Sequence, residues 1–327
     1  MKHFSIRIVA LTALFATFTI YADPMMASTR TYCFGRYLID IPVDAPVVAS
    51  GNEYISTQIK FEKLDASGFD KQVQAKENKY KNNAEEGGQK YVKTIFSDSK
   101  NKRLIVSLAD TLGYKIYGID TYKIARPGSI FRTSDNNNSQ KYLDNTIKAY
   151  ETYLNTVRYR PTSNIPSEPG FCFENGFIPS EGKAPEDEQA NLVFQFKNNP
   201  DVVIRVESVV YFGSQPSLLE RLGQSNILLR ILSSVKTINK GAREMNGMHG
   251  EEYLTKYPSD DKTGTASRMV WETMGRIADP LKPSIHLEVS TGEGSGGGVT
   301  VPSSLTDKQT MALYEQVLNS IRIRPIH

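Results

Sequence analysis

Apolar and polar residues alternate along several short runs in both halves of this 327-residue chain, and the alternation predicts strands. The runs are rich in β-branched and aromatic residues and are separated by residues that favour turns. The expected strands cover residues 54–61, 91–96, 103–108, 114–124, 192–196, 202–210, 268–273 and 285–290. The runs 192–196 and 202–210 enclose Asn198-Asn199-Pro200, which predicts a hairpin.

Other segments have the pattern of helices. Residues 68–86 are polar and lysine-rich and end at Gly87-Gly88, which predicts an exposed helix with a solvated charged face. Residues 217–234 carry a stripe of Leu and Ile at helical spacing. The polar run from Asp135 to Asn138 predicts a loop before a closing helix.

The chain contains an internal duplication. Residues 150–161 align without gaps to residues 314–325, with seven identities in twelve positions, and both segments end in Arg-x-Arg-Pro. The openings of the two halves also correspond, because Cys33 and Cys172 each follow an aromatic residue and precede apolar residues. We therefore predict an N-terminal domain over residues 23–163 and a C-terminal domain over residues 164–327.

The fold class expected for both halves is α+β. Strands occur in runs, with one long helix crossing and one helix closing each half, and parallel β-α-β units are not evident. This order predicts two related lobes, each a largely antiparallel sheet with flanking helices.

The first 22 residues have the pattern of a signal peptide. Lys2 and Arg7 precede an apolar stretch, and Ala22 is a small residue at the expected cleavage position, with Ala27 as the alternative. The apolar stretch is too short for a stable membrane anchor, and no cysteine suited to lipidation follows it. We expect export to the periplasm.

Charge and motifs exclude several classes of function. Without Lys2 and Arg7, 37 Lys and Arg oppose 36 Asp and Glu, so a nucleic-acid partner is not expected. The glycine-rich residues 292–298 lack the Gly-Lys-Ser/Thr ending of a phosphate loop. The segment Gly247-Met248-His249-Gly250-Glu251-Glu252 lacks the second histidine of a zinc protease motif. No catalytic residue, metal or cofactor is predicted.

Three residues leave alternatives open. A hydrolase could use His249 or His286, although the chain has no Gly-x-Ser-x-Gly motif, so this class of function is kept as the weaker alternative. The only tryptophan, Trp271, lies on a predicted strand, where core packing is favoured over a role as an interface anchor.

Several segments together resemble one family. The opening Thr31 to Pro42 resembles the N-terminal domain of periplasmic immunity proteins that neutralise type VI secretion lipase effectors. The second half resembles their C-terminal domain. The segments that carry this second resemblance are residues 170–172, 250–252, 270–272, 279–283, 287–292 and 320–325.

The resemblance implies a claw-like, two-domain inhibitor that is not an enzyme. Members of this family hold a phospholipase effector between their domains and block movement of its lid by protein–protein interaction. The cognate lipase-type toxin would then be the partner of this chain. A periplasmic scaffold or a ligand-binding module is the alternative from another class of proteins.

The resemblance transfers no contact residues, so candidates for partner binding come from predicted loops, which often carry specificity. They are Asp135 and Asn137 in the first half, and Asp260, Asp261, Lys262 and Glu293 in the second half.

Cys33 and Cys172 are the only cysteines, and an oxidising compartment favours a disulfide between them over two separate buried thiols. We predict that a thiol assay on the denatured, unreduced mature protein detects no free thiol. Two free thiols per chain would contradict the disulfide. The same assay after reduction is the positive control and should give two.

Overall fold

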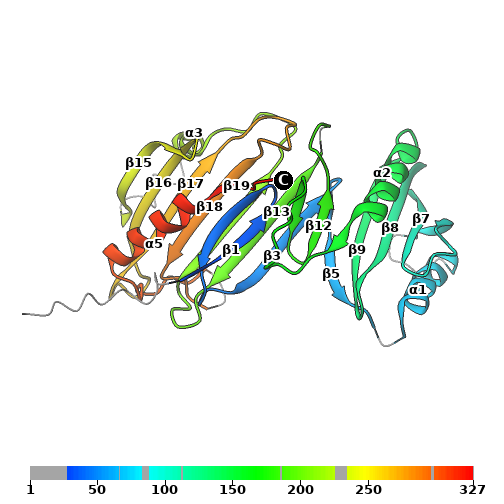
Figure 1. The fold of residues 1–327 in the computed structure, drawn as a ribbon, viewed down its shortest axis with the longest axis horizontal. Coiled ribbons are helices and arrows are strands. Elements are labelled where there is room, and N and C mark those ends of the chain that lie inside the picture. Colours follow the sequence, from blue (N-terminus) through cyan, green and yellow to red (C-terminus); the bar gives the residue numbers. More distant parts are fainter. Residues whose placement is uncertain are drawn as a thin grey trace, which may run out of the picture.

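The computed structural model describes residues 28–326 except 66, 83–87, 112, 185, 225–233 and 296–297. The predicted signal peptide and half of the predicted helix 217–234 lie outside the described residues. The chain forms a large lobe and a smaller lobe side by side, with the C-terminus between them (Figure 1). Every strand pairing in the described residues is antiparallel, as the sequence predicted.

Each lobe is built on one main sheet. In spatial order, the eight-stranded sheet consists of β15 (Lys236–Met245), β16 (Met248–Pro258), β17 (Thr265–Thr273), β18 (Ser284–Thr291), β14 (Val203–Val209), β13 (Glu188–Gln195), β3 (Val47–Tyr54) and β4 (Thr57–Gln58). The five-stranded sheet of the small lobe consists of β5 (Lys60–Lys63), β9 (Ser129–Ser139), β8 (Tyr114–Arg126), β7 (Lys102–Thr111) and β6 (Lys90–Ile95).

The two repeats meet where β3 pairs with β13. The cysteines are 139 residues apart, and with this offset Gly51 corresponds to Ala190 and Asn52 to Asn191. In the ladder, Gly51 pairs with Asn191 and Asn52 pairs with Ala190. Gly51 thus pairs with the equivalent of Asn52, and Asn52 pairs with the equivalent of Gly51. An approximate twofold axis between the two strands produces this pattern. Only Ile59 separates β4 from β5, so the chain passes directly from the large sheet to the small one.

The repeats also exchange their opening hairpins. The hairpin of β1 (Thr29–Phe34) and β2 (Tyr37–Pro42) pairs with β19 (Arg322–Ile323), at the end of the second repeat. The hairpin of β11 (Gly170–Phe173) and β12 (Gly176–Pro179) pairs with β10 (Arg158–Tyr159), at the end of the first repeat. The predicted domain boundary at residue 163 lies between the two repeats in the sequence. The eight-stranded sheet and both three-stranded sheets nevertheless contain strands from both sides of that boundary.

A disulfide joins Cys33 of β1 to Cys172 of β11, with an S–S distance of 2.09 Å. The two cysteines are equivalent residues of the two repeats. Both cysteines are buried in a small cluster with Leu38 and Phe177. Beside it, the backbone N–H groups of Gly35 and Cys172 each donate to the other residue's carbonyl at 2.7 Å. Covalent and hydrogen bonds therefore connect the two exchanged hairpins directly.

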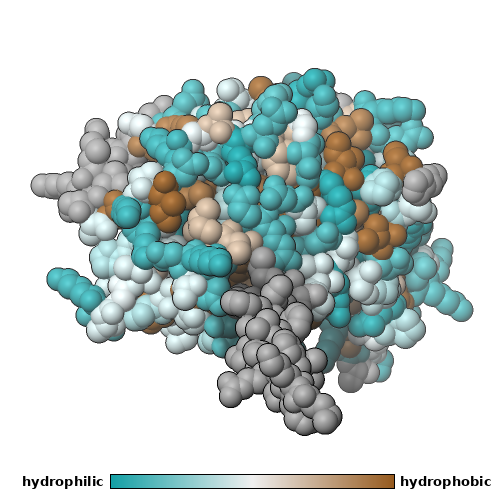
Figure 2. All heavy atoms as spheres, turned by 60° about the vertical axis from the view of Figure 1, so that its left-hand side comes forward, coloured by the Kyte–Doolittle hydropathy of each residue, from teal (hydrophilic) through white to brown (hydrophobic). Residues whose placement is uncertain are grey.

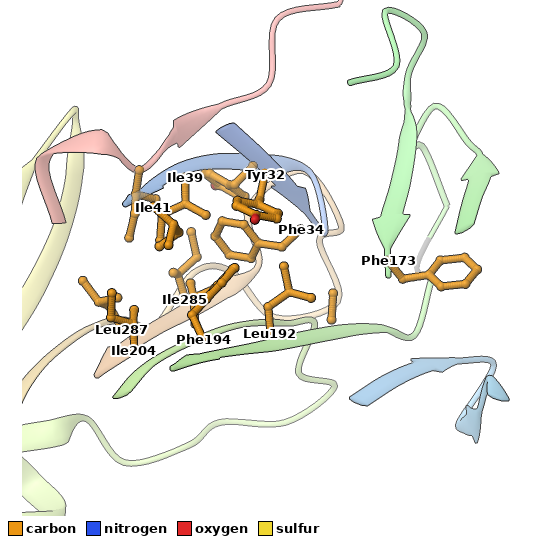
Figure 3. Close-up of a cluster of buried hydrophobic side chains, with 14 of the residues drawn as sticks. Tyr32, Phe34, Ile39, Ile41, Phe173, Leu192, Phe194, Ile204, Ile285 and Leu287 are labelled. Atoms are coloured by element: carbon orange, nitrogen blue, oxygen red, sulfur yellow. The ribbon is translucent and has the colours of Figure 1, made fainter. Parts of the chain in front are cut away.

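One hydrophobic core runs through both lobes. Side chains of the β1–β2 hairpin point onto Leu192, Phe194 and Ile285 of the large sheet (Figure 3). The same cluster includes Leu104 and Phe131 of the small sheet. Because no solvated gap separates these groups, the lobes are expected to move as one body.

Four helices in the described residues cover the sheets, two on each. They are α1 (Phe69–Lys81), α2 (Leu143–Thr156), α3 (Leu218–Gln224) and α5 (Asp307–Ser320). On β16, Glu252 accepts a hydrogen bond from Tyr314 of α5, whereas the adjacent Glu251 accepts from the backbone of Leu219 in α3. Adjacent strand residues point to opposite faces, so α5 and α3 cover opposite faces of the large sheet.

The predicted core position of Trp271 is confirmed. The indole is fully buried, and its Nε1 donates to the carbonyl of Arg243 at 3.0 Å, so the ring belongs to the core rather than to an exposed interface. This bond ties β17 to β15, the edge strand that hydrophobic alternation did not reveal.

Two predicted elements are wrong. The strand expected at 54–61 is broken by a turn, because Ile55 and Ser56 both adopt φ of 54°. The loop expected at Asp135 to Asn138 is part of β9. A register shift in the β8–β9 ladder accommodates these polar residues. In addition, the helix expected over 68–86 ends at Lys81.

The buried side chain of Arg160, which follows β10, helps to hold the exchanged hairpin of β11 and β12 in place. Its buried guanidinium donates to the carbonyls of Gly176 and Phe173 and also to those of Pro161, Thr162 and Asn164. Burial, and then the charge of Arg324, lower the pKa of Arg160 to about 10. The side chain therefore joins the end of the first repeat to the opening of the second.

We predict that Arg160→Met lowers the free energy of unfolding by about 2–4 kcal/mol, because several buried carbonyls lose their donor. Urea unfolding monitored by circular dichroism would measure the change. Arg158→Met, at a half-exposed position in β10, is the control and should change stability by less than about 1 kcal/mol. Equal stability of both variants would contradict a structural role for the Arg160 guanidinium.

Candidate partner-binding surface

The structure brings together the candidates of the second half. Asp260, Asp261 and Lys262 lie in the turn between β16 and β17, and Glu293 lies in the segment after β18. The backbone N–H of Asp260 donates to the carbonyl of Thr300 at 3.0 Å, and the N–H of Thr300 donates to the Asp260 carboxylate at 2.8 Å. The turn and the glycine-rich segment are therefore joined into one surface.

The turn has little freedom to rearrange. Asp261 accepts from the Ser259 hydroxyl at 2.6 Å, from the backbone of Thr263 at 3.0 Å and from its hydroxyl at 2.8 Å. These hydrogen bonds, that of Ser259 first, lower the pKa of the Asp261 carboxyl. Lys262 is exposed with φ of 58°, at the tip of this ordered turn.

Asp135 and Asn137 lie in β9 of the small lobe. The half-buried Asp135 carboxylate accepts from the backbone of Asn137 at 3.0 Å and from the Tyr150 hydroxyl at 3.3 Å, whereas Asn137 is exposed. The structure does not place these two residues with the other four, because they belong to the other sheet. A partner that contacts all six must bridge both lobes.

Charged side chains form a row on the face of the large sheet that α3 partly covers. Glu293 forms two hydrogen bonds with Arg205, at 2.6 and 2.7 Å. Arg205 also donates to Glu288 at 3.1 Å, and Glu288 accepts from Arg268 at 2.8 Å. Oppositely charged groups thus alternate across β14, β18 and β17.

The row continues through His286. Its Nδ1 lies 2.7 Å from Glu272 Oε1, and its Nε2 lies 3.9 Å from Glu288. Glu272 also accepts two hydrogen bonds from Arg221 of α3, at 2.7 and 2.6 Å. Burial acts to raise the pKa of Glu272, but His286 and Arg221 hold it below the usual range.

The histidines do not have the surroundings of a nucleophile–base pair. His286 lies between two carboxylates, and the hydroxyl of nearby Ser284 donates to the carbonyl of Thr273. His249 is exposed and faces Glu244 at 3.5 Å. Within the described residues, no group of three or more His, Cys, Asp and Glu side chains could hold a metal ion.

Two hollows flank the charged row. One of about 320 Å³ is lined by Glu207, Tyr211 and Ser284, and one of about 480 Å³ by Leu218, Tyr253 and Val270. Arg221, Glu272 and His286 line both. This site was not predicted. Charged or titratable residues two positions apart on β14 and β18, and four apart on β17, were an available signal for one shared sheet face.

The surface of the large lobe that Figure 2 shows is mainly hydrophilic, with small separated apolar patches. Net charge differs between the lobes. Residues 60–160 contain 19 Lys and Arg against 12 Asp and Glu, whereas residues 161–327 contain 16 against 20. A partner that spans both lobes therefore meets surfaces of opposite net charge.

Two family models match the chain in order. The model of the Tle cognate immunity protein 4 N-terminal domain matches residues 30–160, and that of its C-terminal domain matches residues 164–326. This order defines a two-domain immunity protein. Because the two models together cover nearly all of the described residues, the chain belongs to the Tle cognate immunity protein 4 family.

Solved structures have the same fold. The apo structure of the immunity protein TplEi of T6SS from Pseudomonas aeruginosa gives a TM-score of 0.76 at 24% identity, over 91% of this chain and 98% of that chain. A chain in the crystal structure of a Tle4-Tli4 complex gives the same four values. TplEi complexed with an "L" peptide gives a TM-score of 0.73 at 23% identity, over 91% and 99%. A comparison with curated proteins found no match.

We predict that Glu288→Gln lowers the free energy of unfolding at pH 7 by about 2 kcal/mol, because the buried carboxylate loses its charge and its ion pairs with Arg205 and Arg268. Burial acts to raise the pKa of Glu288, but Arg268, Ser290 and Arg205 hold it below the usual range. The stabilisation is therefore present above the unfolded-state pKa of about 4.3 and is lost as the pH falls through the lower folded-state pKa.

Urea unfolding at pH 7, 5 and 3.5 would show the difference between wild type and Glu288→Gln narrowing at the lowest pH. The exposed position Glu244 provides the control variant Glu244→Gln, which should match wild type throughout. A difference that stays constant with pH would rule out the charge of Glu288 as its cause.

Proposed function

We propose that this chain is an immunity protein that binds a cognate phospholipase effector of type VI secretion and keeps it inactive. The observation that carries the proposal is the match of both family models, in order and over residues 30–160 and 164–326. The similar chain in the Tle4-Tli4 complex supports it, because that structure contains an immunity protein together with its effector.

The architecture suits inhibition by binding. The disulfide, the exchanged hairpins and the shared core make one preorganised body, so little conformational entropy is lost when a partner docks. The ordered turn at 259–264 and the ion-paired Glu293 extend this order to the surface. A partner that contacts both lobes buries area on each of them, which helps to reach the total area of a specific, stable interface.

We infer that the chain acts without catalysis. The ring of His286 is held between Glu272 and Glu288, so neither ring nitrogen is hydrogen-bonded to a hydroxyl or thiol nucleophile in the described part of the chain. Inhibition then depends on stoichiometric binding rather than turnover.

We place its action in the periplasm, to which the signal-like residues 1–22 would direct it. No helix in the described residues is long and apolar enough to cross a membrane. A disulfide between Cys33 and Cys172 is also consistent with an oxidising compartment.

Mixing the purified mature protein with a type VI phospholipase effector encoded in the same genome should give a stable complex on size-exclusion chromatography. Hydrolysis of phospholipid vesicles should fall linearly with added protein and stop near one equivalent. The heat-denatured protein is the control and should leave hydrolysis unchanged. Undiminished hydrolysis with no complex, when both proteins are folded, would overturn the assignment for this pair.

A separate survival assay in cells tests the compartment. Cells that export the lipase to the periplasm should survive when they produce the full chain, and should die when they produce a chain that lacks residues 2–22. Equal survival would place protective binding outside the periplasm.

A further inference from the structure

The side chain of Arg36 is buried where the first hairpin meets the second repeat. Arg36 lies in the turn between β1 and β2, and its guanidinium donates two hydrogen bonds to the carboxyl group of Glu188, at 3.0 and 2.7 Å. Glu188 is the first residue of β13, and the two side chains are 8% and 4% exposed. A buried ion pair therefore joins the β1–β2 hairpin to the large sheet.

A second carboxyl group shares the same guanidinium. Glu186 lies 3.4 Å from Arg36 Nη2, and its other carboxyl oxygen accepts from the Ser180 hydroxyl at 2.5 Å. The carboxyl groups of Glu186 and Glu188 are also within hydrogen-bonding reach of each other. We call Arg36, Ser180, Glu186 and Glu188 the Arg36 cluster.

The Arg36 cluster has a place for one proton. Ionised carboxylates only accept hydrogen bonds, so two of them can bond to each other only when one is protonated. Arg36 neutralises one negative charge, and a second charge beside it is costly because burial removes its hydration. A proton shared by the two carboxyl groups removes that cost.

The surrounding cations are committed elsewhere. Burial, and then the charge of Arg36, lower the pKa of Arg324 to about 10. The guanidinium of Arg324 donates to three backbone carbonyls between residues 166 and 170. Lys183 is exposed and paired with Glu181. These interactions leave Arg36 as the cation that serves both carboxyl groups of the cluster.

The other titratable neighbours in the described residues are a tyrosine and an aspartate. Tyr54 pairs with Glu188 across the β3–β13 ladder, and burial, followed by the charges of Glu186 and Glu188, raises the pKa of its hydroxyl. The Asp187 carboxylate accepts a hydrogen bond from the Ser56 hydroxyl. Neither neighbour supplies a positive charge to Glu188.

The pKa of Glu188 agrees with this geometry. Burial raises it to about 8, while Arg36 acts to lower it and Glu186 acts to raise it further. A glutamate of the unfolded chain has a pKa of about 4.3. The folded state thus binds more protons than the unfolded state between these two values, so stability decreases as the pH rises through this range.

We propose that Glu186 and Glu188 share one proton at neutral pH, and that this proton strengthens the contact between the β1–β2 hairpin and β13. When it is lost in alkaline solution, two carboxylates compete for one guanidinium and repel each other. The Arg36 cluster is thus a pH-sensitive connection between the two repeats, and its action depends on no partner protein.

Carbon-13 NMR of protein labelled at the glutamate carboxyl carbons tests the shared proton directly. The Glu188 signal, assigned through its backbone amide, should titrate with a midpoint near pH 8. In Glu186→Gln the midpoint should fall by at least about 1 pH unit, because Arg36 then serves a single carboxylate. A wild-type midpoint below pH 7, or an unchanged midpoint in Glu186→Gln, would overturn the proposal.

Thermal unfolding at pH 6 and pH 9 tests the effect on stability. The wild-type Tm should be at least about 3 °C lower at pH 9 than at pH 6. Glu186→Gln should show at most half of this decrease and should be the more stable protein at pH 9, although it has lost a charged partner of Arg36. Glu181→Gln, which removes an exposed carboxylate paired with Lys183, is the matched control and should follow wild type.

Equal decreases of Tm in wild type and Glu186→Gln would show that the proton does not control the connection. Should Glu186→Gln fail to fold, the wild-type NMR titration decides alone, because a midpoint below pH 7 leaves no shared proton at neutral pH.

Discussion

The antiparallel pairing of β3 with β13 is the interaction on which the rest of the molecule depends. It joins equivalent strands of two repeats, so the large sheet continues towards the small one through β4 and β5. The exchanged hairpins, the disulfide and the continuous core all follow the same approximate twofold relation. Apolar burial at this junction comes mainly from β13, whose Ala190, Leu192 and Phe194 are buried, whereas the only buried residue of β3 is Asn52.

Polar groups have two distinct tasks in this structure. Buried Arg160 and Arg324 donate only to backbone carbonyls in the described residues, and so hold chain segments together without a carboxylate. The row from Glu293 to Arg221 instead alternates charges on a partly exposed sheet face. The first arrangement fixes the frame, and the second presents a patterned surface on it.

Local sequence patterns predicted individual helices and strands better than they predicted which strands pair with each other. The alternation at 192–196 and 202–210 gave a correct hairpin, and the aligned segments 150–161 and 314–325 both form a helix followed by a short strand. The break at Ile55 and Ser56 has no Gly, Pro or Asn to indicate it. The strand at Asp135 to Asn138 was missed because the neighbouring β8, and not the local composition, determines its conformation.

The pairing of strands across repeats could not be predicted from local patterns. For example, β2 and β19 pair with each other but lie near opposite ends of the sequence. The candidate site has the same limit. Asp260 and Glu293 were chosen singly as loop residues, and only the fold shows that their segments are hydrogen-bonded to each other. Arg205 and Glu288 were missed because they lie on strands, whereas the candidates were taken from predicted loops.

The hairpin exchange sets the order in which this chain can fold. The β1–β2 hairpin is made first, yet its partner strand β19 is nearly the last segment to leave the ribosome or a translocation channel. Cys33 likewise has to wait for a thiol 139 residues further along. The late contacts are long-range and close the structure only when the whole chain is present, which makes folding slow relative to chains with local contacts. Neither repeat alone therefore contains all the strands of its own sheets, and a truncated chain is left with unpaired strand edges.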